Sequence, residues 1–153
     1  MTRPTSKREL KPSVLDRLLA DGGAWTLDSA KIAVKRDLEW LLNSRRVVSK
    51  HPTTFKPLAQ SLVTYGLPDL ASLCPVAAGD QQKLRLEIQE TIKRFEPRLM
   101  RVRVTLEPAP SPERSVRFRI DALLRVEPEP EPVVFDSVLR LDDQTFEIRD
   151  ESP

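Results

Sequence analysis

The sequence predicts an α+β fold in which N-terminal helices pack on one face of a small antiparallel β-meander, although a mixed sheet is also compatible with it. Apolar residues recur at helical spacing up to Phe95, whereas from Leu99 onward they alternate with polar residues at the spacing of a strand. The connections between the predicted strands are short, which favours antiparallel neighbours. Helices followed by a run of strands are typical of this class.

The change from one period to the other occurs at 95–99, which reads Phe-Glu-Pro-Arg-Leu. Pro97 disfavours helical geometry at Glu96 and has no N–H to donate, so the preceding helix, Asp80 to Phe95, must end here. The buried stripe of that helix is predicted to be Leu84, Ile88, Ile92 and Phe95. Glu96, Pro97 and Arg98 therefore occupy a rigid corner, which is either a structural hinge or a presented binding site.

Two further helices are expected upstream. The first, Val14 to Leu19 with Ser13 as N-cap, carries an apolar face that we expect to dock on the rest of the domain. That face consists of Val14, Leu15, Leu18 and Leu19. The second helix is expected from Ala30 to about Ser44, capped by Asp28 or Ser29. Its predicted buried side is Ala30, Ala33 or Val34, Leu38, Leu41 and Leu42. Trp40 lies outside this stripe, and we expect it either to pack on a neighbouring loop or to lie at an interface.

The remaining segments are assigned from turn signals and alternation. Residues 47–78 are expected to be mostly loop, with a turn and then one short helical turn at 65–70. In the first strand, Met100, Val102, Val104 and Leu106 are expected to point inward. Later strands are predicted at 116–126, which is the strongest signal, at 133–141 and at 145–149. The Glu-Pro run at 127–132 is expected to be an extended, polyproline-like connection.

Composition excludes several classes of protein. Lys and Arg number 25 against 23 Asp and Glu, and a net charge of +2 argues against a general nucleic-acid or membrane binder. One cysteine, Cys74, and one histidine, His51, exclude an internal disulfide and Cys- or His-rich metal sites. Without a signal-peptide or membrane-span pattern, we expect cytoplasmic residence without membrane insertion. We expect a flexible arm at 1–11 and a single domain at 12–150.

Three motifs carry a resemblance to a known family. The first motif consists of Arg36, Asp37, Leu38, Glu39, Trp40, Leu41, Leu42 and Asn43. The second consists of Tyr65, Gly66, Leu67 and Pro68 with the following Asp69 and Leu70, and the third is the segment 95–99. In this order they resemble the sheath-initiator family of contractile injection machines, and most closely its TssE branch, the baseplate subunits of bacterial type VI secretion systems. The segment 13–18 is also similar to that branch. Ser44, where threonine is usual, and the Glu-Pro run depart from the pattern.

The resemblance implies a structural baseplate subunit without enzymatic activity or cofactor. It implies that Glu96, Pro97 and Arg98 dock on a helical core bundle of the wedge subunits (TssF, TssG, TssK). It also implies a sheet that engages the sheath subunits TssB and TssC by strand addition. The expected sheath-facing residues are Arg101, Arg103, Arg117, Arg119, Val134, Asp136, Val138, Arg140, Phe146 and Ile148. A monomer in isolation, and assembly at the inner face of the cell envelope, are expected.

From the residues alone, simpler interpretations stay open. The corner is compatible with a helix stop bearing two solvated charges. The segment 36–43 is compatible with an amphipathic helix that has a solvated face, or with Asp37 and Arg45 capping or bridging to the neighbouring strand corner. The arginines of the first two strands, including Arg125, are compatible with a solvated face.

Two other functions each have some support in the sequence. The lysozyme-like label of the family suggests a hydrolase that uses Glu96 with Asp121 or Glu39, but an aromatic sugar platform is missing from the sequence. A basic nucleic-acid module would rest on the arginine face alone, without interleaved aromatic residues.

Overall fold

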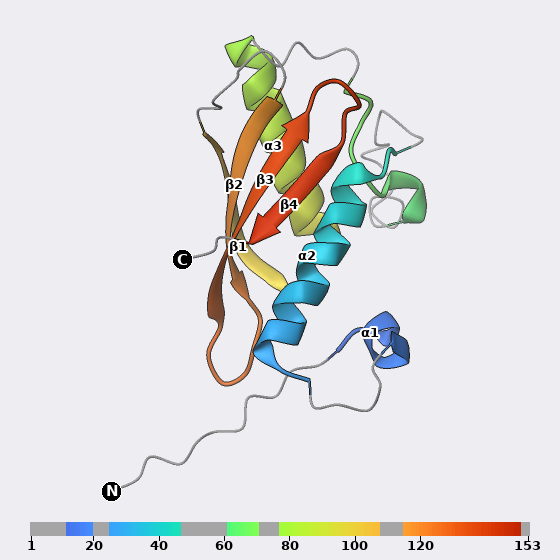
Figure 1. Cartoon of the computed structure of the whole chain (residues 1–153), viewed down its shortest axis with the longest axis vertical. Helices are drawn as coiled ribbons and strands as arrows, with labels where there is room; N and C mark the ends of the chain where they lie inside the picture. Colours follow the sequence, from blue (N-terminus) through green and yellow to red (C-terminus); the bar gives the residue numbers. More distant parts are fainter. Residues whose placement is uncertain (1–11, 20–24, 47–60, 71–76, 108–114, 151–153) are drawn as a thin grey trace, which may run out of the picture.

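The computed structural model describes residues 12–19, 25–46, 61–70, 77–107 and 115–150 (Figure 1). The predicted arm at 1–11, and Cys74 and His51, lie outside these residues. The helices are α1 (Val14–Leu19), α2 (Leu27–Asn43), the 3₁₀ turn η2 (Leu62–Thr64) and α3 (Ala78–Phe95). The strands are β1 (Leu99–Glu107), β2 (Ser115–Leu124), β3 (Glu131–Arg140) and β4 (Phe146–Asp150).

The four strands form one antiparallel sheet in the order β1-β2-β3-β4, which confirms the predicted α+β meander. Helix α3 packs against β1 and α2 against β4, and their apolar stripes share one core with the inner face of the sheet. Leu38, Ile88, Ile92 and Ile120 in that core have no exposed surface. Figure 1 shows α1 set apart at one end of α2. In the part of the chain that the structure describes, no helix is long and apolar enough to cross a membrane.

The predicted stripes of α2 and α3 are confirmed, and α1 begins at Val14 as predicted, but α2 and α3 begin earlier than predicted, at Leu27 and Ala78. All of Ala30, Ala33, Val34, Leu38, Leu41 and Leu42 are buried on α2, as are Leu84, Ile88 and Ile92 on α3, with Phe95 half-buried. Helix α2 begins three residues earlier than predicted because Thr26, not Asp28 or Ser29, is its N-cap and accepts a hydrogen bond from the Ser29 N–H at 3.2 Å.

The predicted alternation holds along β2 but changes phase in β1. The register shifts between Met100 and Arg103, and Arg101 adopts a positive φ of 53°. Such a bulge places two residues of one strand opposite one of its partner. As a result Leu99, rather than Met100, points into the core, while Val102 and Val104 follow the prediction.

Two predictions about connections are wrong. The helical turn near Tyr65 precedes it, at η2, instead of following it. The Glu-Pro run is not an extended connection: the chain bends at Pro128 and Glu129, and β3 begins at Glu131, paired with Leu124. Pro132 is accommodated near the start of that strand, a position that proline tolerates.

The expected apolar docking of α1 is also wrong. Val14, Leu15 and Leu18 are 73%, 39% and 78% exposed, whereas Asp16 is 3% exposed. The side chain of Leu19 is not among those described. This helix therefore rests on the domain through its carboxylate, and its apolar residues are left on the surface.

The charged corner and its groove

Glu96 and Arg98 form a closed unit at the joint between α3 and β1. Glu96 is the C-cap of α3, and its N–H donates to the Ile92 carbonyl at 2.8 Å. Its Oε1 accepts from the N–H and the Nε of Arg98, at 3.2 and 2.7 Å, and its Oε2 accepts from Arg98 Nη2 at 2.6 Å. Pro97 keeps the two side chains close. Glu96 is 4% exposed, so the carboxylate of this bidentate pair is buried, whereas the side chain of Arg98 is 25% exposed.

Two carboxylates from other helices extend this unit. Arg98 Nη2 also donates to Asp37 Oδ2 on α2, and Arg98 Nη1 lies 3.7 Å from Asp16 Oδ2 on α1. Arg36 donates to Asp37 Oδ1 through Nε and Nη2 at 3.0 and 2.8 Å, and to Asp16 Oδ1 at 2.8 Å. We call these five side chains (Asp16, Arg36, Asp37, Glu96 and Arg98) the corner network.

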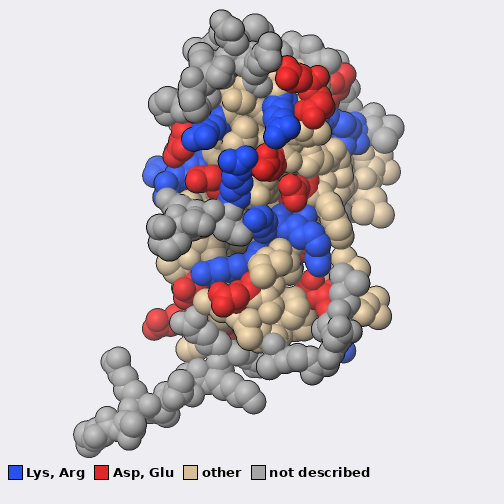
Figure 2. Space-filling view, in the orientation of Figure 1, with Lys and Arg blue, Asp and Glu red and all other residues tan. Residues whose placement is uncertain are grey.

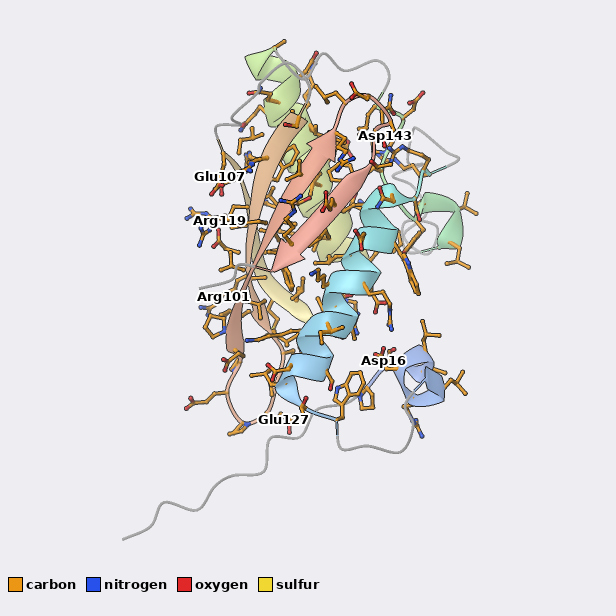
Figure 3. All side chains as sticks on the ribbon, in the orientation of Figure 1. Asp16, Arg101, Glu107, Arg119, Glu127 and Asp143 are labelled. Carbon is orange, nitrogen blue, oxygen red and sulfur yellow. The ribbon has the colours of Figure 1, made fainter. Side chains whose placement is uncertain are left out.

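Asp16 has a second role in its own helix. Its N–H donates to Ser13 Oγ at 3.1 Å, and its Oδ2 accepts from the Ser13 N–H at 3.1 Å and from Ser13 Oγ at 2.6 Å. This is a capping box with aspartate at the third helical position. The predicted N-cap role of Ser13 is thereby confirmed. In Figure 3 the labelled Asp16 lies on the side of α1 that faces α2.

Hydrogen bonding dominates the electrostatics of the network. Burial acts to raise the pKa of Asp16, but hydrogen bonds from Ser13 and Arg36 outweigh it, and the pKa lies below its usual value. Burial acts to lower the pKa of Arg98, and the bonds and charges of Glu96 and then Asp37 raise it well above the usual value. Both groups are therefore held in their charged forms.

A groove of about 530 Å³ lies over the network. Its apolar walls come from α1, α2, the segment after η2 and the corner itself. The lining residues are Ser13, Leu15, Asp37, Trp40, Leu41, Tyr65, Phe95, Glu96, Pro97 and Arg98. Residues from all three sequence motifs thus meet at one concave surface.

The second motif holds one wall of this groove in place. Leu67 forms a short parallel bridge with Arg45. The Leu67 N–H donates to the Ser44 carbonyl and the Leu67 carbonyl accepts from the Arg46 N–H, at 2.9 Å each. Gly66 has a φ of +95°, and a Cβ there would lie 2.3 Å from the Ser44 carbonyl oxygen, so only glycine fits. Tyr65 consequently reaches Phe95, with ring centroids 5.2 Å apart in an edge-to-face arrangement.

Trp40 is half-exposed rather than packed on a loop. Its exposed fraction is 52%, and the guanidinium carbon of Arg36 lies 5.1 Å from the ring centroid. This cation–π contact joins the aromatic wall of the groove to the corner network.

The predicted sheath-facing residues do not all share one surface. Arg101, Arg103 and Arg117 are exposed and Arg119, Val134, Asp136 and Val138 are half-buried, all with side chains away from the core, and Arg140 is exposed at the end of β3. Phe146 and Ile148 are 2% and 3% exposed, because they belong to the inner face of β4. A partner can reach these two residues only through their main chain. The prediction that their side chains face the sheath is therefore wrong.

Acidic residues oppose the arginines on the outer face of the sheet. The register pairs Arg103 with Asp121 and Arg119 with Asp136, and it pairs Glu107 with Arg117. Arg119 also lies 3.4 Å from Asp121 and 4.0 Å from Glu107. The labelled Glu107 and Arg119 lie near each other in Figure 3, and Figure 2 shows the two signs of charge intermixed on the face it views. Arg103, Arg117 and Arg119 therefore each lie opposite a carboxylate, which offsets the repulsion among them.

Side chains from the helices occupy both edges of the sheet. Asn43 accepts from the Phe146 N–H at 2.8 Å and donates to the Phe146 carbonyl at 2.9 Å, as a neighbouring strand would. On β1, Gln89 accepts from the Val104 N–H at 3.2 Å and Arg85 donates to the Val104 carbonyl at 3.3 Å. These contacts restrict where another strand can add.

Sequence reasoning did not find the roles of Asp16, Asn43, Arg85 and Gln89. A signal existed for the first: Ser13 with an acidic residue three positions later is a capping pattern. Nothing local marks the others, because their partners are on distant strands. Of the two side chains that could cap or bridge to the corner, Asp37 does bridge to it, whereas Arg45 donates to the Leu42 and Gln144 carbonyls at 3.1 and 2.6 Å.

The carboxylates considered for hydrolysis do not converge. Both oxygens of Glu96 are bound by Arg98, so neither is free to donate a proton to a leaving group. Asp121 lies on the outer face of β2 beside Arg119, and neither it nor Glu39 lines the groove. Among the described residues, no group of three or more His, Cys, Asp or Glu side chains is arranged to hold a metal ion.

A small α+β domain with a rigid charged corner under a partly apolar groove is suited to protein assembly. A family model described as baseplate wedge protein gp25 matches residues 28–129, which include all three motifs. The chain therefore belongs to the gp25 family of baseplate wedge proteins, and its class is a structural baseplate component of a contractile machine. Searches of curated proteins and of solved structures found no significant match.

Proposed function

We propose that this protein is the TssE-type subunit of a type VI secretion baseplate, which links the wedge subunits to the first ring of the contractile sheath. Membership of the gp25 family supports the baseplate role. The resemblance of the three motifs to the TssE branch supports the assignment to type VI secretion. In this role the protein is cytoplasmic and has no catalytic activity.

The wedge contact is proposed at the corner and its groove, with TssF, TssG and TssK as the wedge subunits. The observation that carries this proposal is the corner network, because five side chains from α1, α2 and the α3–β1 joint are locked together beneath a 530 Å³ groove. A surface that is already ordered loses little entropy when a partner binds. Glu96 is too buried to be a freely presented charge. It therefore acts by fixing the floor of the groove, with Pro97 exposed at the rim.

The sheath contact is proposed at the end of the sheet where β3 extends beyond β4. Strand β4 pairs with β3 only from Phe135 to Leu139, so residues 132–134, which pair with β2 on one side, have no strand on their other side among the described residues. A groove of about 370 Å³ follows this stretch, lined by residues of β3 and α2: Asp28, Lys31, Ile32, Pro132, Val133, Val134 and Phe135. An extended segment of TssB or TssC would find main-chain partners and apolar contacts there.

Co-purification with the wedge subunits tests the corner contact. Replacing both Glu96 and Arg98 would confuse docking with folding, because Glu96 is buried. Pro97→Tyr instead adds neutral bulk at an exposed position. We expect it to reduce co-purification at least about tenfold, because hot spots are concentrated in such pockets. Thermal unfolding of the variant is measured in parallel, because Pro97 also ends α3 and holds the corner. The matched control, Asp142→Tyr, changes an exposed residue of the β3–β4 turn outside the groove and should bind normally.

Two results would contradict the proposal. One is a wild-type chain that does not associate with wedge subunits, and the other is a Pro97→Tyr variant that associates as well as the control. The assignment to type VI secretion is tested separately by the neighbouring open reading frames, which should encode wedge and sheath subunits of that system.

A further inference from the structure

We propose that three helix side chains take the place of neighbouring strands at the two edges of the sheet. They are Asn43 on α2 and the pair Arg85 and Gln89 on α3, and we call them the edge-capping residues. They prevent copies of this chain from pairing edge to edge, and they leave Val134 of β3 as the position where a partner strand can add. The part that concerns Val134 rests on the proposed function, whereas the part that concerns self-pairing does not.

Asn43 closes the edge of β4. In an antiparallel ladder, the N–H and the carbonyl of one residue point toward the same neighbouring strand, and the direction alternates along the chain. The Phe146 N–H donates to Asn43 Oδ1 at 2.8 Å, and the Phe146 carbonyl accepts from Asn43 Nδ2 at 2.9 Å. Because a carboxamide offers both a donor and an acceptor, as a peptide group does, Asn43 occupies the place of a residue on a fifth strand.

Two side chains have the same role at the edge of β1. Gln89 Oε1 accepts from the Val104 N–H at 3.2 Å, and Arg85 Nη1 donates to the Val104 carbonyl at 3.3 Å. Arg85 and Gln89 are four positions apart on α3, so they lie on the same face of that helix. The bulge at Arg101 interrupts the beginning of this edge. Bulges and cationic side chains both discourage the addition of a strand at an edge.

The edge of β3 differs, because one of its residues is open. The Arg140 N–H donates to the Thr145 carbonyl at 2.9 Å, toward β4. Alternation along β3 therefore directs the N–H and the carbonyl of Val134 toward the same side. The pairing with β4 extends no further than Phe135, so no strand lies on that side of Val134 among the described residues. Val134 also lines the groove of about 370 Å³ beside α2.

The two kinds of edge have different consequences for assembly. A row of unpaired main-chain groups pairs as readily with a second copy of the same chain as with a different partner. In the proposed role, self-pairing would consume the subunits that begin a sheath. A single open residue such as Val134 offers only two main-chain hydrogen bonds, which hold a strand only when its side chains also fit the neighbouring groove. The sheet is therefore closed to itself and open to one matching segment.

Self-association of the full chain tests the capping of β1. Replacing Arg85 and Gln89 together by methionine removes both hydrogen bonds to Val104 and keeps most of the side-chain volume. The matched control is the double variant Lys83→Met and Lys93→Met, which adds two methionines at exposed positions of the same helix. In sedimentation velocity, we expect the dimer dissociation constant of the Arg85→Met, Gln89→Met variant to be at least about tenfold lower than those of the control and the wild type.

Hydrogen exchange separates capping from a general effect on the fold. At low protein concentration, the Val104 amide of the Arg85→Met, Gln89→Met variant should exchange at least about tenfold faster than in the wild type, while the centre of β2 is unchanged. At high concentration its exchange should slow again, because a second copy then pairs with this edge. A variant that merely loosened α3 would accelerate exchange along the whole helix at every concentration.

Asn43→Leu provides an independent test at the other edge. We expect it to cause self-association and concentration-dependent exchange at Phe146, for the same reason. Should one of the two variants unfold, the other tests the proposal on a different helix and strand. The sheath subunits TssB and TssC are then added. We expect them to slow exchange at Val134 in the wild type, and at Val104 as well in the Arg85→Met, Gln89→Met variant.

The outcomes separate this inference from the proposed function. Variants that stay monomeric although their edge amides exchange faster overturn the capping role, and so does exchange at Val104 and Phe146 that matches the wild type. Sheath subunits that bind but protect the wild type at Val104 or Phe146 overturn the assignment of Val134. Sheath subunits that protect no edge amide overturn the proposed sheath contact, while self-association of the variants still decides the capping role.

Discussion

Two regions of this molecule hold arginines beside carboxylates, and they hold them differently. At the corner, Glu96 is 4% exposed and Arg98 is shared among three carboxylates from three segments of the chain. On the sheet, Arg140 and Arg149 are 60% and 58% exposed and contact Glu147 at 3.5 and 3.1 Å. Exposed pairs contribute little to stability, whereas a buried pair is costly to break. Both regions use arginine and carboxylate side chains, so burial and the number of partners distinguish a structural network from a solvated face.

The largest expected effect comes from breaking the corner network. Arg98→Ala leaves Glu96 buried and without its bidentate partner, and it frees one oxygen of Asp37. We expect the free energy of unfolding to fall by about 3–5 kcal/mol, the range for removing one partner of a buried ion pair. Arg103→Ala, in the exposed region of β1, should change it by no more than about 0.5 kcal/mol. Urea unfolding of both variants checks this, and equal midpoints would show that the two regions do not differ as stated.

A smaller effect is expected at the edge of β4. Asn43→Ala removes two hydrogen bonds and leaves the Phe146 N–H and carbonyl without their side-chain partner. The expected loss is roughly 1–3 kcal/mol, the cost of leaving such groups unsatisfied. Hydrogen exchange at Phe146 should accelerate more than exchange in β2. Unchanged exchange at Phe146 would mean that the amide of Asn43 does not protect this edge.

How much of this could be predicted depends on the range of the interaction. The stripe on α3, the alternation of β2 and the end of α3 at Glu96 follow from local periodicity and from Pro97, and the structure confirms them. The bulge at Arg101 leaves no pattern in the sequence that departs from ordinary alternation. The pairing of Asn43 with Phe146 spans 103 positions, so no window of the sequence contains both residues.

The candidate site, like the fold, could be predicted only in part. The sequence predicts the corner at 95–99, and it suggests that Glu96 and Arg98 are either solvated or available to a partner. In the structure Glu96 is buried, and both of its carboxylate oxygens accept hydrogen bonds from Arg98. The docking of α1 was mispredicted for a physical reason. Apolar periodicity indicates which side of a helix avoids water, but a six-residue helix with a carboxylate near two guanidiniums is held more firmly by that carboxylate.

The smallest effect concerns the attachment of α1, and it carries a dependence on pH. Because the pKa of Asp16 is lower in the folded protein than its ordinary value of 3.8, its contribution to stability is present above about pH 4 and is lost as the pH falls through the folded value. Asp16→Asn should lower the free energy of unfolding by about 1 kcal/mol at neutral pH, since a neutral amide binds Arg36 more weakly. Hydrogen exchange in α1 should accelerate in this variant, while exchange in α3 should not. The decisive measurement is the carboxyl carbon titration of Asp16 by NMR, with a midpoint expected below 3.8. A midpoint above that value would mean that burial outweighs the hydrogen bonds of Ser13 and Arg36, and that α1 is held at the corner by something other than its carboxylate.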